Sequence, residues 1–331
     1  MTQVVEIMNV VPAGDQPPPD NLAGTGEVPR RKFGRTEVVV SALGLGGSTF
    51  AKAATKKEAI QIVQEAVDGG ITFMDNAWEY NGGKSEELMG EALRGRRDAV
   101  FLMTKVCSHG RNKRAALKQL EQSLRRLKTD HLDLWQIHEV VYENDPELHF
   151  AKGGAMEALV QAREQGKVRF LGFTGHKSPA IHQRMLAYGF PFDAVQLPLS
   201  GFDAGFRNFE QEVLPLLLRR GIAPIGMKSL NGTAEAVKQG VVTAEEAIRY
   251  AMSLPVTTTI SGMDSLKILR RNLAIARRFK PMTLKEKAAH RKKSAVAAGD
   301  GRFELYKVSI YFDGAEGREQ HRYPPEGTLA A

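Results

Sequence analysis

Residues 73–80, FMDNAWEY, place a carboxylate and a phenol five residues apart, at Asp75 and Tyr80. Asp75 comes directly after the apolar stretch 71–74, and Tyr80 follows in the next polar segment. Two more functional groups, Lys105 and His138, directly follow the later apolar stretches 99–104 and 132–137. Each of these residues alone has an ordinary structural explanation, such as a helix cap or a packed ring. Together they are a set that could protonate a carbonyl oxygen.

The chemistry of this set is that of general acid catalysis. A free phenol has a pKa of about 10, so Tyr80 alone is a weak proton donor at neutral pH. A neighbouring ammonium favours the phenolate, and Lys105 could supply it while Asp75 keeps Lys105 charged and oriented. His138 could hydrogen-bond a substrate carbonyl. Such catalysis is worth about 10²- to 10⁴-fold in rate, but the hydride must come from elsewhere, so a nicotinamide cofactor is expected.

Short apolar runs alternate with amphipathic stretches along most of the chain, a rhythm typical of strand–helix repeats. The expected strands are 42–46, 71–74, 99–104, 132–137, 168–173, 194–197, 222–226 and 257–260. The expected helices are 55–69, 84–94, 111–127, 151–166, 178–188, 208–220, 243–253 and 264–279. Eight such pairs predict a (β/α)8 TIM barrel, whose functional groups gather at the carboxyl ends of the strands.

The alternative fold is a doubly wound open sheet, which would need a glycine-rich phosphate loop after its first strand. The glycines of 44–47 lack the GxGxxG spacing, so the barrel is preferred. Residues 1–29 are rich in Pro and Gly and are expected to be a flexible tail. The barrel, an NAD(P)H-dependent oxidoreductase domain, is expected over 30–280, starting with a hairpin that turns at Gly34. Residues 281–331 are expected to form a helical and aromatic C-terminal extension packed on it.

Composition restricts the function classes. The 331 residues are 42% hydrophobic and carry a single cysteine, Cys107, which excludes internal disulfides, four-cysteine zinc sites and four-cysteine iron–sulfur clusters. The net charge is +8, but the basic residues are scattered along the chain and aromatic residues do not alternate with them. We therefore expect no nucleic-acid partner. No apolar run reaches the length of a membrane span. We expect no metal site, no membrane partner and a cytoplasmic location, and leave the oligomeric state open.

The four candidate residues also carry a family resemblance. The run FMDNAWEY resembles the Asp-x-Ala-x-x-Tyr signature of the aldo-keto reductase superfamily, and the segments 104–105 and 136–138 resemble its next two motifs. The hairpin sequence RKFGRTEVVVSALGLGG looks like the family's N-terminal segment, and the resemblance covers about 30–280. It implies a (β/α)8 barrel, an extended NAD(P)H and reduction of a small-molecule carbonyl substrate, such as one derived from a sugar. The family's catalytic tetrad then falls on Asp75, Tyr80, Lys105 and His138.

The resemblance also implies a cofactor path along the strand ends. Two positions depart from the family pattern: Thr174 followed by Gly175 replaces the common Ser-Asn pair, and Met227 replaces an aromatic ring. The residues expected to bind the cofactor are Gly47, Thr174, Gln196, Met227, Lys228, Ser229, Leu230, Gly262, Met263, Asp264, Arg270, Arg271 and Asn272. The residues expected to line the substrate pocket are Trp78, His138, Tyr142 and His176.

The cofactor expected is NADPH, with NADH as the alternative. A helix begins near Asp264, and its free N–H groups suit a phosphate. Asp264 would repel a 2′-phosphate if it faced the ribose, whereas Arg270 and Arg271 are rigid donors that could bind one. The positive net charge favours the more anionic cofactor.

Two other function classes remain open at the level of sequence. One is a barrel that binds NADP(H) as a regulatory subunit without catalysis, which the complete set of four residues disfavours. The other is a hydrolase with two carboxylates as acid and base, which would need a second acidic strand end beside Asp75. Only Glu139 is available for that role.

Overall fold

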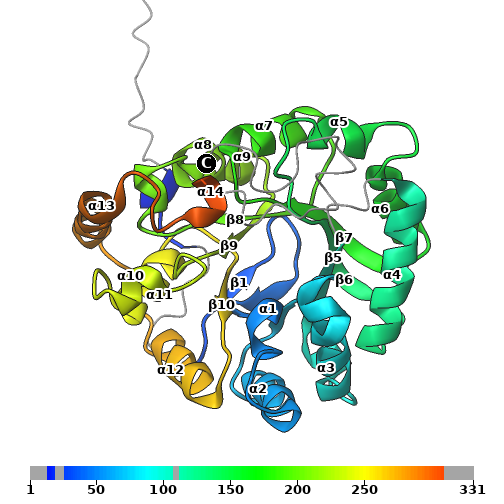
Figure 1. Ribbon diagram of the computed structural model, residues 1–331, viewed down its shortest axis with the longest axis horizontal. Helices are drawn as coiled ribbons and strands as arrows, with labels where there is room; N and C mark the ends of the chain where they lie inside the picture. The colour runs from blue at the N-terminus through cyan, green and yellow to red at the C-terminus, as the bar shows by residue number, and fades with distance from the viewer. Residues whose placement is uncertain (1–12, 19–25, 107–111, 309–331) are drawn as a thin grey trace, which may run out of the picture.

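Eight parallel strands close into a barrel in the part of the chain that the structure describes (Figure 1). The structure is a computed structural model that describes residues 13–18, 26–106 and 112–308. The strands are β3 (Leu43–Gly46), β4 (Phe73–Asp75), β5 (Phe101–Val106), β6 (Leu132–Ile137), β7 (Val168–Thr174), β8 (Ala194–Pro198), β9 (Ala223–Met227) and β10 (Thr258–Gly262). They follow one another around the barrel in chain order, and β10 closes it against β3. The prediction of a (β/α)8 barrel is therefore confirmed.

Helices surround the strands and bury them on their outer side (Figure 1). The helices that follow successive strands are α2 (Lys56–Asp68), α3 (Lys84–Ala92), α4 (Lys113–Leu127), α6 (Ala155–Glu164), α7 (Pro179–Ala187), α8 (Phe209–Glu212) with α9 (Leu214–Arg219), α11 (Ala244–Met252) and α12 (Leu266–Arg277). The hydroxyl of Thr243 accepts the N–H of Glu246 while the Glu246 side chain accepts the N–H of Thr243, so this capping box starts α11.

The boundaries of some helices and strands differ from those expected from the sequence. The stretch 208–220 is two helices, because Pro215 has no N–H to continue the ladder past Val213. Several strands end one to two residues later than expected, so Lys105 lies inside β5. Strands buried on both faces are continuously apolar and show no alternation that would mark their ends. Some short helices were not predicted, among them α1 (Gly47–Phe50), α5 (Asp145–Phe150) and α10 (Glu235–Lys238).

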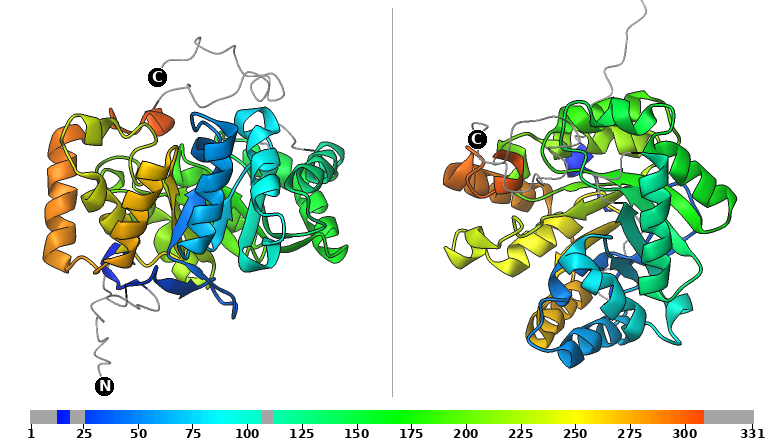
Figure 2. Two further views of the ribbon diagram at one scale, coloured as in Figure 1. Left: turned by 90° about the horizontal axis from the view of Figure 1, so that it is seen from below. Right: turned by 45° about the vertical axis from the view of Figure 1, so that its right-hand side comes forward.

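A hairpin closes the amino-terminal end of the barrel, on the face opposite the expected site (Figure 2, left). Strands β1 (Arg30–Lys32) and β2 (Val39–Ser41) pair antiparallel, and the turn between them inserts Phe33 among the interior rings of Phe101 and Phe170. Gly34 has a φ of +56°, and a Cβ there would lie 2.7 Å from the carbonyl oxygen of Gly221. Only glycine therefore fits this turn.

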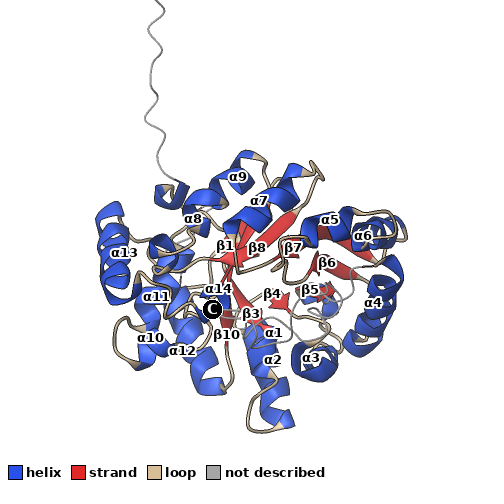
Figure 3. Cartoon of the chain, turned by 45° about the horizontal axis from the view of Figure 1, so that its top comes forward, coloured by secondary structure: helices blue, strands red, loops and turns tan. Residues whose placement is uncertain are grey.

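The chain after the barrel returns to its carboxyl end (Figures 2 and 3). Helix α13 (Leu284–Ala298) packs beside α11 and the short 3-10 helix η4 (Asp203–Gly205), and α14 (Leu305–Val308) lies over the strand ends. The ammonium of Lys307 is fully buried and donates to Asp203 at 2.6 Å, with Glu304 at 2.9 Å. This ion cluster holds α14 against the barrel. Residues 309–312 of the expected aromatic end, and Cys107, lie outside the described residues.

Part of the segment expected to be a flexible tail lies against the barrel. The 3-10 helix η1 (Ala13–Asp15) contacts α8 and α9. The buried Lys287 donates to the carbonyl oxygen of Gly14 at 2.6 Å, and Arg291 donates to Asp15 at 2.9 Å. For residues 13–15 the expectation of flexibility is therefore wrong. Composition did not reveal this because the segment binds through a backbone carbonyl and one carboxylate rather than through apolar side chains.

Removing residues 1–18 is expected to destabilise the protein relative to a chain that starts at Ala13. The deletion leaves the Lys287 ammonium, 2% exposed, without the Gly14 acceptor. An unsatisfied buried donor costs about 1–3 kcal/mol, more when charged. Thermal melting of both chains measures the difference, and Lys287→Met in the shorter chain should recover most of the loss. Equal melting temperatures for the two chains would show that the η1 contact contributes no stability.

None of the helices in the described part of the chain is both long and apolar enough to span a lipid bilayer.

Candidate active site

Three neighbouring strands and one loop bring the four candidate catalytic residues to the carboxyl end of the barrel. Asp75 is the last residue of β4, Lys105 is the fifth residue of β5, and His138 directly follows β6. Tyr80 opens the 3-10 helix η2 (Tyr80–Gly83) in the loop after β4. Because these strands are adjacent and parallel, their ends meet at one edge of the site.

Lys105 is the centre of the hydrogen-bond network. Its side chain is 1% exposed and its ammonium donates to the carboxylate of Asp75, to the carbonyl oxygen of Asn76 at 2.7 Å and, at 3.4 Å, to the hydroxyl of Tyr80. An ammonium has three donors, so all three are directed at these acceptors. The ring of Tyr80 stands edge-on to the imidazole of His138, with centroids 5.5 Å apart. The four residues predicted from sequence therefore lie together.

A second set of contacts holds the loop that carries Tyr80. The N–H of Trp78 donates to the carbonyl oxygen of Lys105 at 3.2 Å. The carbonyl oxygen of Trp78 accepts from Arg126 at 2.9 Å, and Arg126 also pairs with the buried Glu86 at 3.2 Å. Glu86 in turn accepts from Thr104, next to Lys105, at 2.6 Å. Strand β5 and the helices α3 and α4 thus hold the loop that carries the phenol.

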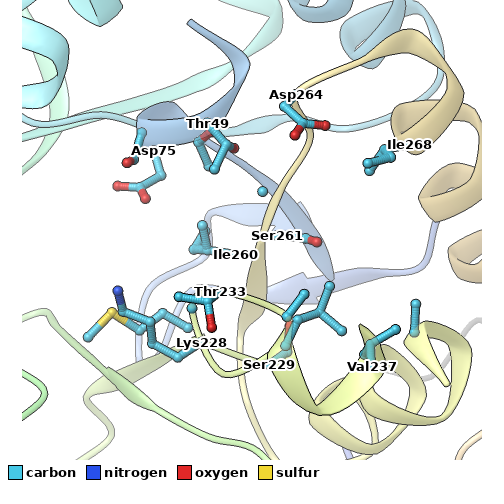
Figure 4. A pocket seen from close by; sticks show the side chains of 18 of the residues that line it. Thr49, Asp75, Lys228, Ser229, Thr233, Val237, Ile260, Ser261, Asp264 and Ile268 are labelled. Carbon is cyan, nitrogen blue, oxygen red and sulfur yellow. The ribbon is translucent and has the colours of Figure 1, made fainter. Parts of the chain in front are cut away.

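A cavity of about 460 Å³ runs from these residues along the strand ends (Figure 4). Asp75 and Lys228 lie at one end of it in the view of Figure 4, and Val237 and Ile268 lie at the other. One wall comes from the end of β10 and the start of α12, and the other from the segment between β9 and α10. The shape suits an elongated ligand whose one end reaches Asp75 and Tyr80.

Most of the residues expected to bind a cofactor line this cavity. Those that do are Gln196, Met227, Lys228, Ser229, Leu230, Gly262, Asp264 and Arg271. Of the remaining five, Thr174 pairs with Gln196 across β7 and β8, and Gly47 lies between the lining residues Gly46 and Ser48. Met263 and Asn272 are fully buried, and the Asn272 side chain donates to Ser261 at 3.1 Å from behind the wall.

Arg270 faces away from the cavity. Its guanidinium forms an ion pair with Glu65 of α2 at 2.6 Å on the outer surface, so its expected phosphate contact is wrong. Ser265 caps α12, because its side chain accepts the N–H of Ile268. The Asp264 carboxylate is therefore left at the cavity wall.

Charges around the phenol determine its acidity. Burial first, and then the carboxylates of Asp75, Glu79 and Glu139, raise the pKa of Tyr80 well above its usual value. Burial also lowers the pKa of the Lys228 ammonium, an effect that Glu139 opposes. Tyr80 therefore keeps its proton at neutral pH in the protein without ligand, which a proton donor must do.

Comparison with known proteins places this site in a family. A model of the Aldo/keto reductase family matches residues 42–235, more than half of the chain and all four candidate residues. The chain belongs to the aldo/keto reductase family. An uncharacterized oxidoreductase of Bacillus subtilis, YqkF, is 25% identical over 315 residues, covering 81% of this chain and 98% of that protein. Methylglyoxal reductase YeaE of Escherichia coli is 34% identical over 167 residues, covering 49% of this chain and 54% of that protein.

Solved structures of the family share the fold. An aldo-keto reductase from Klebsiella pneumoniae in complex with NADPH matches with a TM-score of 0.65 and 24% identity, over 78% of this chain and 93% of that one. The holo form of the aldo-keto reductase AKR11C1 from Bacillus halodurans matches with a TM-score of 0.66 and 23% identity, over 83% of this chain and 99% of that one. Because the sequence identities are below 25%, the similarity to these two structures supports the barrel fold of this protein and nothing more specific.

The residues expected to line the substrate pocket of this aldo/keto reductase family member are placed differently. The indole N–H of Trp78 donates to Gln122 on α4 at 2.7 Å, and the ring packs on Arg126, so Trp78 does not line the cavity. Tyr142 is buried in the loop before α5. Neither Trp78 nor Tyr142 is among the residues that line the cavity, and for Trp78 the reason is that its indole is bound on α4. Contact of either ring with a substrate stays a prediction. The carboxylate of Glu139 lies between the imidazoles of His138 and His176, 3.9 Å from Nε2 of His138 and 3.2 Å from Nε2 of His176.

The cavity also has walls that sequence reasoning missed. Ser48 and Thr49 of α1 and Ser261 of β10 line it, and so do Gly232, Thr233, Ala234, Val237 and Lys238. The signal available in the sequence was the long connection between the expected strand 222–226 and the helix at 243, since a long loop at a barrel's carboxyl end is usually functional. No group of three or more His, Cys, Asp or Glu side chains able to hold a metal occurs in the described ranges.

Proposed function

We propose that this protein reduces an aldehyde or ketone to the alcohol with NADPH, and that Tyr80 donates the proton to the carbonyl oxygen. The observation that carries the proposal is the buried ammonium of Lys105, which contacts both Asp75 and the Tyr80 hydroxyl at one end of an elongated cavity. Membership of the aldo/keto reductase family supports it. The named activity of methylglyoxal reductase YeaE and the NADPH in the Klebsiella pneumoniae structure support it further.

The cavity walls fit a nicotinamide nucleotide. The side-chain oxygen Oε1 of Gln196 is buried at the wall and has no hydrogen-bond partner among the described residues, so it could accept from a carboxamide. A Cβ at Gly262 would lie 2.9 Å from Thr49, so glycine lets the end of β10 and α1 approach closely. Lys238 and Arg271 also line the cavity and are cations suited to phosphate. A reduced nicotinamide held here supplies the hydride.

The protein's own groups then position the substrate and deliver a proton. The carbonyl oxygen would accept from the hydroxyl of Tyr80, with His138 beside it to fix its direction. As negative charge develops on that oxygen, the Tyr80 proton transfers to it and the phenolate left behind is stabilised by the Lys105 ammonium. The Asp75 carboxylate keeps Lys105 charged and in place. Acid catalysis by a positioned group of this kind contributes about 10²- to 10⁴-fold.

Loss of NADPH absorbance in the near ultraviolet, measured with a panel of aldehydes and ketones, tests the proposal. The expected result is carbonyl-dependent oxidation of NADPH, with stoichiometric alcohol. Binding of NADPH without turnover of any carbonyl in the panel would favour the regulatory barrel instead.

Lys238 and Arg271 line the cavity and Arg270 does not, so Lys238 replaces Arg270 among the cations expected to select NADPH. Val237 and Ile268 mark the far end of the cavity, and Lys238 and Arg271 follow them by one and three residues (Figure 4). A hydrogen bond to a charged group is worth about 1.5–3 kcal/mol. The double variant Lys238→Ala, Arg271→Ala is therefore expected to weaken NADPH binding at least tenfold while NADH binding changes little.

Fluorescence titration of both cofactors measures this selectivity. Arg270→Ala is the matched control, because Arg270 is the neighbouring arginine on the same helix and is held by Glu65 on the outer surface. The control should leave the NADPH to NADH ratio unchanged. Tighter NADH binding by the natural protein, or equal weakening of both cofactors in the double variant, would contradict the assignment.

A further inference from the structure

Glu139 has a backbone conformation that glutamate rarely adopts. It directly follows His138, and its φ is +54°, in the left-handed region. For residues with a side chain this conformation is strained, so the surroundings must hold it in place. In this conformation the Glu139 carboxylate lies beside the imidazole of the preceding residue, His138. One Glu139 oxygen lies 3.9 Å from Nε2 of His138 and 3.2 Å from Nε2 of His176.

Hydrogen-bond bookkeeping assigns the protons of His176. This imidazole is 3% exposed, and its Nδ1 lies 3.1 Å from the carbonyl oxygen of Tyr306 while its Nε2 faces the Glu139 carboxylate. A carbonyl oxygen and an ionised carboxylate only accept hydrogen bonds. Both ring nitrogens can donate to these two acceptors only if His176 carries two protons, as an imidazolium ion between the active site and α14.

The groups that face Glu139 come from four elements. His138 follows β6, His176 follows β7, and Lys228 follows β9, itself left-handed with a φ of +60°. Tyr306 of α14 covers this side, with its ring 5.5 Å from the Lys228 ammonium. Burial alone would raise the pKa of Glu139, but His138, His176 and Lys228 together hold that pKa at about 2. The carboxylate is thus ionised throughout the working range of pH.

We propose that Glu139 is a positioning residue for the reductase site: its carboxylate holds the His138 imidazole beside Tyr80, and the His176 imidazolium, bound by the Tyr306 carbonyl, holds Glu139. On the other side the Glu79 carboxylate lies next to Nδ1 of His138, so a carboxylate lies near each ring nitrogen. This restrains rotation of the ring that stands edge-on to Tyr80. The catalytic part of the proposal rests on the proposed function, whereas the charged state of His176 does not.

Glu139→Gln tests the role of the charge, because glutamine keeps the shape of the side chain. We expect kcat to fall about tenfold, at the lower end of what acid–base positioning is worth, with little change in KM. Glu139 is also one of the carboxylates that raise the pKa of Tyr80. Its removal should therefore shift the alkaline limit of the reduction towards lower pH, since the other charges near the phenol, Asp75, Glu79 and Lys105, are unchanged. A purely structural residue would not move that limit.

Glu143→Gln is the matched control, an exposed glutamate of the same loop that pairs with Arg184. It should leave kcat and the pH profile unchanged. An outcome in which Glu139→Gln also leaves both unchanged, while Tyr80→Phe is inactive, would overturn the positioning role and leave the proposed function standing.

Nitrogen-15 spectra of the histidine rings test the charged pair without any turnover. At about pH 8 an ordinary histidine is mostly neutral. His176, identified by loss of its signal in His176→Gln, is expected to show both nitrogens protonated in the natural protein and to lose that signature in Glu139→Gln. A neutral His176 in the natural protein would overturn the proposal even if carbonyl reduction is observed. If no carbonyl is reduced but the imidazolium is present, the proposed function fails and the Glu139–His176 ion pair stands.

Discussion

Replacing Tyr80 by Phe is expected to lower kcat for carbonyl reduction by at least about 10²-fold while NADPH still binds. Phenylalanine keeps the ring beside His138 and below the Lys105 ammonium, which lies 4.8 Å from the ring centroid, but removes the hydroxyl that donates the proton. Steady-state kinetics and fluorescence titration of NADPH, made on the same preparation, separate turnover from binding. Near-normal turnover by the variant would show that another group is the donor.

The pH dependence gives an independent check on the same donor. Reduction needs the protonated phenol, so its rate is lost only as the pH rises through the pKa of Tyr80. Burial, Asp75, Glu79 and Glu139 raise that pKa above its usual value of about 10. The reduction rate should therefore stay level through neutral and mildly alkaline pH. A decline centred near pH 7, of the kind typical of histidine, would assign proton donation to His138 instead.

Replacing Lys105 by Met is expected to damage stability as well as activity. Lys105 and Asp75 are 1% and 5% exposed at their side chains and form a buried ion pair. Removing one partner of such a pair leaves an uncompensated buried charge and costs about 3–5 kcal/mol. Denaturant unfolding of the variant and the natural protein measures this loss, and kcat should fall because the phenolate formed at Tyr80 loses its cation.

The double variant Asp75→Asn, Lys105→Met separates the two effects. Neutralising Asp75 removes the stranded carboxylate, so most of the stability should return, whereas the activity should not. A double variant as unstable as Lys105→Met would show that packing, rather than charge, causes the loss. A Lys105→Met variant with normal kcat would show that Lys105 has no part in catalysis.

The four candidate catalytic residues could be predicted from the sequence because in a (β/α)8 barrel the order of the strands along the chain fixes which strand ends are neighbours. Each parallel strand delivers its last residues to one face, so Asp75, Lys105 and His138 could be placed together once their apolar stretches were recognised as neighbouring strands. The alternation of strands and helices was strong enough to predict the barrel itself. Errors of one or two residues at the strand ends did not matter, since the side chains still reached the same face.

Orientation within helices and loops could not be predicted in the same way. Arg270 and Arg271 are adjacent in α12, yet one pairs with Glu65 outside and the other lines the cavity. Successive helical residues point about 100° apart, so the choice depends on which face packs on the barrel. The left-handed turn of Glu139 and the rotation of the Trp78 indole towards Gln122 depend on partners distant in sequence. No local pattern contains that information.

A single-turnover reaction with NADPH deuterated at the transferable position of its nicotinamide tests the central proposal most directly. Mass spectrometry of the product should find one deuterium on the former carbonyl carbon of the alcohol, and Tyr80→Phe should form that product at least about 10²-fold more slowly. Oxidation of the cofactor without deuterium in the alcohol, or no alcohol from any aldehyde or ketone offered, would contradict carbonyl reduction at this site.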